Sequence, residues 1–596
     1  MLLNKKQINN YNFLKPTKLL SKTDGKKIII NIILYYGLRV FILSYGIIRI
    51  FLINIYLGIS NFGLLNVMML ISPLCLFCIS GCQDKSNFIL YKYSLINDFK
   101  SLNRLINEQI KEMRFYSFLS LFLVFFLMII SYFFVNSPGL NHITACLLIL
   151  GNSVGMLSFG IILPYVQWYL NSLHFNYVYD IWEIFFATLL NVTSFILIII
   201  FGKHEFVFPN TNYEEGATYI VLIVTFLLSI RLGLANIILN FFKKKYMSWF
   251  KREKIKHFNF FDKNTISYIA QSFLSAVAVT IVPISFFILT TVIHLGTALS
   301  GIYYSYVTFV VIINLLGWGI TAIKPYLAKF IIKNSREKMF HLNKLITYAF
   351  FYIGLILLIN FVIISPYLMV FMKSYFSFWL AFLIGICYLF FVVKLVDEAF
   401  IYLDGRPEKY WRLTLYEICV GIIFIVISIS LVFCIPSLSH NVISLIFAIG
   451  ISEASMRISK YFFNIVYLNK YIYHKNIIEY FHHYWTIYMI TLITICVIVL
   501  VISLSPYIKE VENSFRNNQL INVWSFENIT SLFKDDLYAI NYQNVFISII
   551  FVNIFIIFLW WSNIKFINNR TNNEYKQFIK EIKKEIIYNI KWRKYR

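Results

Sequence analysis

The sequence predicts an all-α, polytopic integral membrane protein with about fourteen transmembrane helices. The composition is the first observation: the mean hydropathy is +0.71, and 59% of the 596 residues are hydrophobic while only 14% are charged. These values exclude a soluble globular chain of this length. Second, apolar runs of about 20 residues recur along the chain, and in lipid a helix satisfies its own backbone hydrogen bonds. Third, the positive charge of the loops alternates from one side of the membrane to the other.

Each expected span is an apolar run bounded by polar or basic residues. The spans cover residues 28–57, 64–82, 115–135, 143–170, 176–201, 217–242, 265–294, 302–322, 346–371, 375–401, 411–435, 441–468, 484–508 and 542–561. Because their number is even, both termini must lie on the same side of the membrane. No cleavable signal peptide is expected, since residues 1–27 are polar and basic and the first span is too long for a signal core.

The distribution of the basic residues gives the orientation. Of the 53 Lys and Arg residues, 43 lie in one alternating set of loops and five lie in the opposite set. The first set comprises residues 1–27, 83–114, 171–175, 243–264, 323–345, 402–412, 460–483 and 565–596. Positive loops stay in the cytoplasm, so both termini are expected there, in a protein of the cell membrane. The formal charge of +25 then reflects topology, with anionic lipid headgroups as partners, and nucleic-acid binding is not expected.

The chain also shows the trace of an internal duplication. Residues 57–63 and 295–301 carry the same Gly-to-Gly spacing, each directly after an expected span. Glu183 in the fifth span corresponds to Glu417 in the eleventh, and Arg231 in the sixth corresponds to Arg457 in the twelfth. Six spans separate the copies, so the halves enter the membrane with the same topology, as in transporters built from parallel repeats.

This duplication divides the chain into two lobes of six helices with additions at either end. The expected parts are a basic cytoplasmic N-terminus at 1–27, an N-lobe at 28–242, a cytoplasmic linker at 243–264, a C-lobe at 265–468, two further helices at 469–561 with an external loop at 509–541, and a basic cytoplasmic tail at 562–596.

Charged side chains inside the spans are the candidates for function, because each costs roughly 2.5–3.5 kcal/mol to insert. Five are basic and form the predicted substrate-binding set: Arg39, Arg49, Arg231, Lys394 and Arg457. On one interpretation they line a shared cavity and bind an anionic substrate, since a planar guanidinium pairs with two phosphate oxygens. On the other interpretation they form structural ion pairs or extend toward water, and the sequence leaves both open.

Four acidic residues inside the spans are the candidates for ion coupling: Asp180, Glu183, Glu417 and Glu453. A carboxylate in a partly dry cavity can take up and release H⁺ or accept Na⁺, so coupling to one of these ions is expected, and no other cofactor. The alternative is structural pairing, for example of Glu453 with Arg457 four residues later.

No metal site is predicted from the cysteines. Cys75, Cys78 and Cys82 have metal-like spacing, but no matching pair of cysteines or His cluster accompanies them. They are interpreted as buried apolar side chains.

Two short motifs resemble a known family. Span one ends in Arg49-Ile50-Phe51 and is followed by Leu57-Gly58-Ile59-Ser60-Asn61-Phe62-Gly63-Leu64, which is similar to the first-helix signature of the polysaccharide flippases. These transporters belong to the multidrug/oligosaccharidyl-lipid/polysaccharide (MOP) exporter superfamily, in which an Arg precedes a Leu-Gly-x-x-x-(Tyr/Phe)-Gly turn. The turn from Gly296 to Gly301, followed by Tyr303-Tyr304-Ser305, is similar to the recurrence of that signature at the seventh helix. Arg49 lies further from its turn than in the common pattern.

The resemblance implies a transporter and not an enzyme. It would move an undecaprenyl-diphosphate-linked oligosaccharide or polysaccharide precursor from the inner to the outer leaflet by alternating access, beside membrane proteins of glycan assembly. The cavity arginines would hold the diphosphate while the lipid tail stays in the bilayer.

Two alternatives stay open. A multidrug or cation antiporter of the same superfamily would need an acidic cavity. A membrane glycan polymerase or ligase, which is a different class, would need a large external loop rich in Arg or His, whereas residues 509–541 hold only Arg516 and two lysines.

Overall fold

The protein is described here by a computed structural model. It describes residues 22–57, 59–93, 99–134, 145–151, 164–172, 176–201, 213–253, 259–292, 299–308, 336–371, 377–403, 407–435 and 442–477, together with isolated positions between these ranges and within 550–561. The described residues are almost entirely helical, and eight of their helices are long and apolar enough to cross a membrane. The all-α membrane fold is therefore confirmed. Part of the fourth expected span, most of the eighth, thirteenth and fourteenth spans and of the terminal tails, and the loop at 509–541 lie outside the described residues.

Among the described residues, the first half contains six helices and one helical turn. They are α2 (Lys22–Tyr56), α3 (Ile59–Tyr93), α4 (Phe99–Phe134), α6 (Tyr165–Ser172), α7 (Asn176–Phe201), α8 (Tyr213–Phe241) and α9 (Lys243–Tyr246). The second half contains α10 (Lys263–Val292), α12 (Arg336–Phe371), α13 (Phe378–Leu403), α14 (Pro407–Cys434) and α16 (Val442–Tyr467), and the π-helical segment η2 (Leu468–Tyr473) continues from α16.

Several helices extend beyond the apolar runs that predicted them. α4 begins at Phe99 and not at 115, and α12 begins at Arg336 and not at 346. Hydropathy marks the segment that lies in lipid, whereas the helix continues for as long as its own hydrogen bonds are supported by packing. Both extensions are on the predicted cytoplasmic side.

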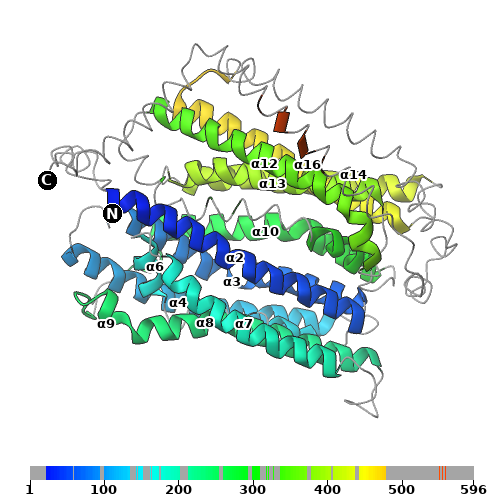
Figure 1. The fold of residues 1–596 in the computed structure, drawn as a ribbon, viewed down its shortest axis with the longest axis horizontal. Helices are drawn as coiled ribbons and strands as arrows, with labels where there is room; N and C mark the ends of the chain where they lie inside the picture. The colour runs from blue at the N-terminus through cyan, green and yellow to red at the C-terminus, as the bar shows by residue number, and fades with distance from the viewer. Residues whose placement is uncertain are drawn as a thin grey trace.

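The helices of the first half lie on one side of α10, and the other helices of the second half lie on its opposite side (Figure 1). In the first half, α7 packs against both α2 and α8, and in the second half α14 packs against both α10 and α16. Counted within each half, the fifth expected helix (α7 or α14) thus contacts the first (α2 or α10) and the sixth (α8 or α16). This recurrence is what an internal duplication with the same topology in both copies produces.

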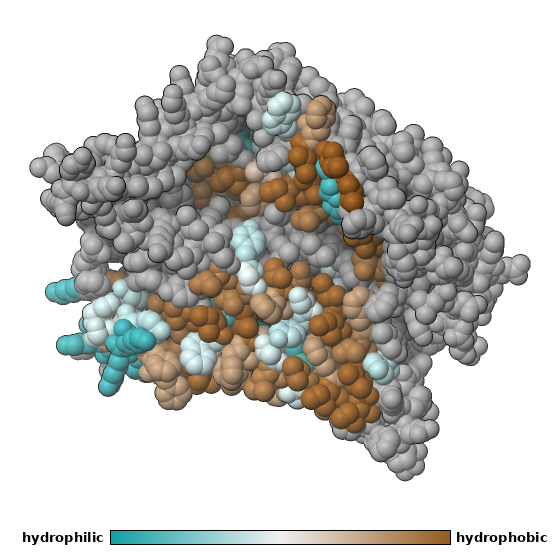
Figure 2. Space-filling view, viewed as in Figure 1, coloured by the Kyte–Doolittle hydropathy of each residue, from teal (hydrophilic) through white to brown (hydrophobic). Residues whose placement is uncertain are grey.

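The outer surface of the described helices is apolar. On α7, an unbroken stripe of side chains at helical spacing is exposed: Ile181, Phe185, Leu189, Val192 and Ile196. Figure 2 shows that apolar side chains cover most of the described part of this face, and that hydrophilic ones gather at its left end, where α9 lies in Figure 1. A soluble protein does not expose such a surface, so these helices face lipid.

The linker between the halves is attached to the first half. Asn103 of α4 donates from Nδ2 to Glu253 Oε1 at 2.7 Å and accepts at Oδ1 from the backbone N–H of Lys251 at 2.9 Å. Asn107, one turn later, donates from Nδ2 to the carbonyl of Lys251 at 2.9 Å. The N-terminal extension of α4 therefore provides the surface on which residues 251–253 lie.

The halves meet where α3 crosses α10. A Cβ on Gly81 would lie 2.7 Å from Cα of Ile269, so the two backbones approach too closely for any other residue without a shift. One turn along α3, Lys85 Nζ lies 2.7 Å from Glu112 Oε1 and 2.5 Å from Thr265 Oγ1. The crossing is thus defined by one glycine and one buried polar cluster.

We predict that Gly81→Ala lowers stability by about 1–3 kcal/mol, because the added methyl group must displace the α10 backbone. The measurement is thermal unfolding of the protein purified in detergent. Gly46→Ala is the matched control, since a Cβ there has no atom within 4 Å and α2 should tolerate it. Equal effects of the two substitutions would contradict the close crossing.

Candidate functional site

The first charged cluster lies between α2, α7 and α8. Asp180 and Glu183 are three residues apart on α7, so their side chains share one face of the helix. Arg39 of α2 donates to both: Nη2 lies 3.0 Å from Asp180 Oδ1 and 3.0 Å from Glu183 Oε2, and Nη1 lies 3.2 Å from Glu183 Oε1. Arg231 of α8 approaches the same carboxylate, with Nε 3.9 Å from Glu183 Oε1.

The arginines and carboxylates of this cluster differ in exposure. The side chains of Asp180 and Glu183 are 3% and 1% exposed, whereas those of Arg39 and Arg231 are 20% and 25% exposed. Arg49, ten residues after Arg39, has a single long contact among the described residues, of 3.5 Å from Nη1 to Asn191 Oδ1. Three arginines therefore stand against two carboxylates, and the accessible side of the cluster is cationic.

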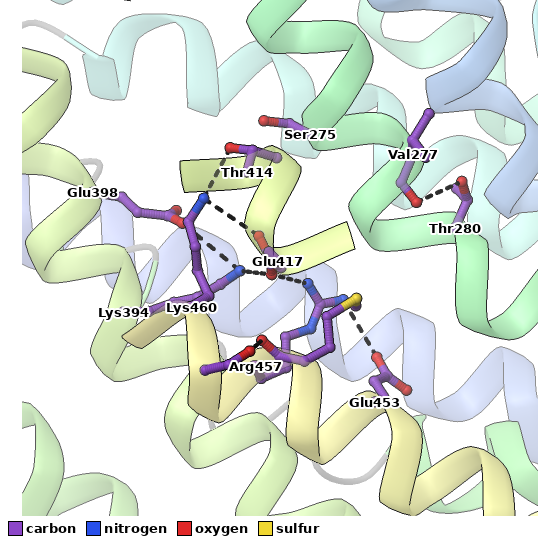
Figure 3. Close-up of polar contacts among 12 residues, drawn as sticks. Ser275, Val277, Thr280, Lys394, Glu398, Thr414, Glu417, Glu453, Arg457 and Lys460 are labelled. Atoms are coloured by element: carbon purple, nitrogen blue, oxygen red, sulfur yellow. Dashed lines mark hydrogen bonds and ion pairs between the residues drawn. The ribbon is translucent and has the colours of Figure 1, made fainter. Parts of the chain in front are cut away.

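The second charged cluster lies between α13, α14 and α16, with Glu417 of α14 at its centre (Figure 3). Lys394 Nζ lies 2.7 Å from Glu417 Oε1, and Arg457 Nη1 lies 3.1 Å from the same oxygen. Lys460 Nζ lies 3.4 Å from Oε2 of Glu417 and 2.8 Å from the hydroxyl of Thr414. One carboxylate thus contacts three cations from two neighbouring helices.

Two further carboxylates balance these cations. Glu453 lies 3.4 Å from Arg457 Nη2 and accepts a hydrogen bond from the Tyr303 hydroxyl. Glu398 lies 3.7 Å from Lys394 Nζ. The cluster therefore holds three cations and three anions, and all of them except Glu398 are less than a tenth exposed. Such a neutral network stabilises the packing of the second half and leaves no exposed cation for an anionic substrate.

The two clusters are built on equivalent positions. In the first half Arg231 approaches Glu183. In the second half Arg457, the predicted equivalent of Arg231, approaches Glu417, the predicted equivalent of Glu183. In addition, Asp180 and Thr414 each stand three residues before the central glutamate. Asp180 is bonded to Arg39 of α2, and Thr414 accepts a hydrogen bond from Gln271 of α10 at 3.2 Å.

The structure therefore brings together most of the predicted residues, and it divides them between the halves. Arg39 and Arg231 join Asp180 and Glu183, while Lys394 and Arg457 join Glu417 and Glu453, and Arg49 is bonded to none of these acids. Glu453 pairs with Arg457, which is the structural alternative that the sequence left open beside a coupling role. The sequence interpretation missed Lys460, although it follows Arg457 by three residues and so had to lie on the same helix face. Binding and coupling roles for the nine predicted residues stay predictions.

A cavity of about 210 Å³ lies between the halves on the predicted cytoplasmic side. Its described lining residues are Asp84, Tyr268, Gln271, Ser272, Ser275, Gly317, Ile320, Leu395, Glu398, Ala399, Ile401, Tyr402 and Tyr410. The Tyr402 hydroxyl donates to the backbone carbonyl of Asp84, which joins the second half to the first. None of the five predicted substrate-binding residues is among this described lining.

Comparison with known proteins identifies the fold. No protein-family model matches the sequence, and no curated protein matches it. Among solved structures, one named protein A matches with a TM-score of 0.53 at 12% identity, over 77% of this chain and 99% of its own. The MATE multidrug transporter DinF-BH, solved as a complex, matches with a TM-score of 0.51 at 11% identity, over 76% of this chain and 98% of its own. An outward-facing MATE family transporter of the MOP superfamily has a TM-score of 0.45 at 13% identity, over 74% of this chain and 96% of its own. The chain therefore shares the fold of DinF-BH.

We predict that Glu417→Gln destabilises the protein by about 3–5 kcal/mol, because it leaves three buried cations with too little negative charge. The double substitution Glu417→Gln with Lys460→Met should recover part of this loss, since it restores the balance of charge. Thermal unfolding in detergent measures both. Glu108→Gln serves as control, because Glu108 is paired with the exposed Arg104 on the N-terminal extension of α4, so the substitution should change stability little. Wild-type stability of Glu417→Gln would rule out this network as a source of stability.

Proposed function

We propose that this protein is a membrane transporter that moves a lipid-linked oligosaccharide, carried on undecaprenyl diphosphate, from the inner to the outer leaflet by alternating access. Support comes from the shared fold with a transporter and from the two halves, which meet along α3 and α10. The motifs that resemble the polysaccharide flippases, around residues 57–64 and 296–305, lie at the start of each half.

The observation that carries the proposal is the difference in exposure within the first cluster. The side chains of Arg39 and Arg231 are partly exposed, whereas those of the carboxylates that they contact, Asp180 and Glu183, are buried. A guanidinium that keeps part of its surface accessible can accept a second anion, and its planar fork matches two phosphate oxygens. Asp180 and Glu183 reduce the free energy needed to keep this positive charge in the membrane before the substrate arrives.

Alternating access requires that the contacts between the halves break on one side. On the predicted cytoplasmic side the polar contacts include the hydrogen bonds of Thr265 with Lys85 and Glu112 and the hydrogen bond of Tyr402 with Asp84. These contacts lie next to the cavity or the helix crossing, and opening this side requires that they break. The neutral cluster around Glu417 lies within the second half and can move with it as a unit.

A multidrug or cation antiporter is the second candidate, and two observations favour it. DinF-BH, whose fold this chain shares, is a multidrug transporter. The cavity between the halves is lined by Asp84 and Glu398, which would attract a cation. In this case Asp180 and Glu183 would be the functional groups, and Arg39 would be their counter-ion.

We predict that Arg39→Ala lowers flipping of the lipid-linked precursor about tenfold to a hundredfold, because a charge-assisted contact contributes roughly 1.5–3 kcal/mol. The substrate should accumulate on the inner leaflet. The measurement is the rate at which a lipid-diphosphate oligosaccharide becomes accessible on the outer face of proteoliposomes.

Arg39→Gln combined with Asp180→Asn is the folding control, since it removes one charge of each sign from the cluster. This variant should fold and still fail to flip. Under the antiporter candidate, Asp180→Asn with Glu183→Gln would abolish export of a fluorescent lipophilic cation, while wild-type protein would not flip the glycan lipid. Normal flipping by a folded Arg39→Ala protein would contradict the proposed role of Arg39.

A further inference from the structure

Asp397 of α13 is a buried carboxylate with no cation beside it. The residue is 2% exposed, and its Oδ1 accepts a hydrogen bond from Asn343 Nδ2 of α12 at 3.0 Å. Its Oδ2 is buried and has no hydrogen-bond partner, and Asp397 forms no ion pair among the residues that the structure describes. Every other buried carboxylate discussed above has an Arg or Lys partner.

Three charged side chains near Asp397, on α13, on α12 and after η2, contact other groups. Glu398, the next residue on α13, pairs with Lys394 and lines the cavity between the halves. Lys344 of α12 and Lys475 after η2 lie over the ring of Phe340, with Nζ 3.6 Å and 4.2 Å from its centre. An ionised carboxylate in this position therefore lacks a counter-charge, which costs several kcal/mol unless a proton or a bound cation neutralises it.

Two further buried oxygens without a hydrogen-bond partner lie on α12 and η2, which both pack against α13. Thr347 stands one helical turn after Asn343 on the same face of α12, is 3% exposed, and has a buried hydroxyl with no hydrogen-bond partner. Tyr473, the last residue of η2, is 6% exposed and its hydroxyl also has no partner. Its ring packs against Phe340, at 5.3 Å between centroids, one turn before Asn343.

Tyr473 is close enough to Asp397 to respond to its charge. Burial, and then the charge of Asp397, raise the pKa of Tyr473 well above its ordinary value, so this residue offers a neutral hydroxyl oxygen at physiological pH. η2 is also the C-terminal end of the long helix that begins as α16, and the backbone of His474 then turns left-handed with φ of 53°. A helix C-terminus carries partial negative charge and favours a cation.

We infer that Asp397, Thr347 and Tyr473 form a binding site for a small monovalent cation such as Na⁺, buried between α12, α13 and η2. The amide of Asn343 fixes one carboxylate oxygen and leaves the other free to contact the ion. Carboxylate and hydroxyl oxygens are hard ligands that suit such a cation. The site lies in the second half, apart from the cavity between the halves. It does not depend on the substrate that is transported, and its effect is to hold η2 against α12 and α13.

The test is thermal unfolding of the purified protein in a NaCl series that is kept at constant ionic strength with N-methyl-D-glucamine chloride. Wild-type protein should become more stable with Na⁺ and should reach a plateau, as expected when a ligand binds the folded state alone. Asp397→Asn keeps the hydrogen bond to Asn343 within reach but removes the charge, so the Na⁺ response should disappear. Thr347→Val and Tyr473→Phe should shift the response to higher Na⁺ concentration, and they remain informative if Asp397→Asn does not fold.

Two matched controls separate this site from other carboxylates and hydroxyls. Glu398→Gln removes the neighbouring carboxylate that lines the cavity and should retain the Na⁺ response. Thr193→Val removes a hydroxyl that is exposed and bonded to its own helix, and should also retain it. The inference is overturned if wild-type stability is the same in both salts, or if Asp397→Asn responds to Na⁺ as the wild type does. It is equally overturned if Glu398→Gln, and not Asp397→Asn, abolishes the response.

Discussion

A buried carboxylate on the fifth helix of each half must be neutralised by cations from the helices around it, and this constraint organises the structure. Glu183 of α7 and Glu417 of α14 hold the arginines of the sixth helices, Arg231 and Arg457. In lipid no water is available to solvate an unpaired charge, so these contacts specify which faces of the helices must meet. The packing of α7 against α8 and of α14 against α16 follows from this pairing together with apolar contact.

The two halves neutralise this buried carboxylate with different sets of side chains. In the second half, Lys394 and Lys460 add to Arg457, and further carboxylates balance them, so the network is neutral and closed. In the first half the additional cation is Arg39 of α2, and the arginines stay partly exposed. In the first half, Arg39 of α2 is bonded to Asp180. At the equivalent place in the second half, Gln271 of α10 is bonded to Thr414, and neither of these side chains is charged. Of the two described clusters, only the one in the first half presents accessible positive charge, and the proposed function depends on this asymmetry.

The sequence predicts the fold class and the equivalence of the two glutamates and two arginines, because each depends on patterns along one chain, while the orientation stays a prediction. Hydropathy locates lipid-facing runs, and the near-constant offset of Glu183/Glu417 and Arg231/Arg457 (234 and 226 positions) indicates the repeat. The sequence does not predict that Arg39 is already held by two carboxylates more than a hundred residues away, since helix rotation and the pairing of distant helices decide that contact. Asp397 shows the same limit. Its position in a span is evident from the sequence, but that it lacks a cation while its neighbour Glu398 has one depends on which face of α13 meets α12.

The same contacts determine which parts of the molecule can move relative to one another under the proposed transport. The linker at 251–253 is bonded to α4, so it moves with the first half and does not form an independent hinge over its whole length. In the second half, Asn360 of α12 and Asn553 exchange two amide hydrogen bonds of 2.8 Å, which attach the last predicted span to that half. Under the proposed transport the halves would move relative to each other at the crossing of α3 and α10. Gly81 places no side chain between these backbones, so they need not separate there when the helices turn, whereas the contacts of Phe77 with Phe273 and of Lys85 with Thr265 must rearrange. The glycine that permits this close approach of the halves is thus also the point at which a change in their angle is least hindered.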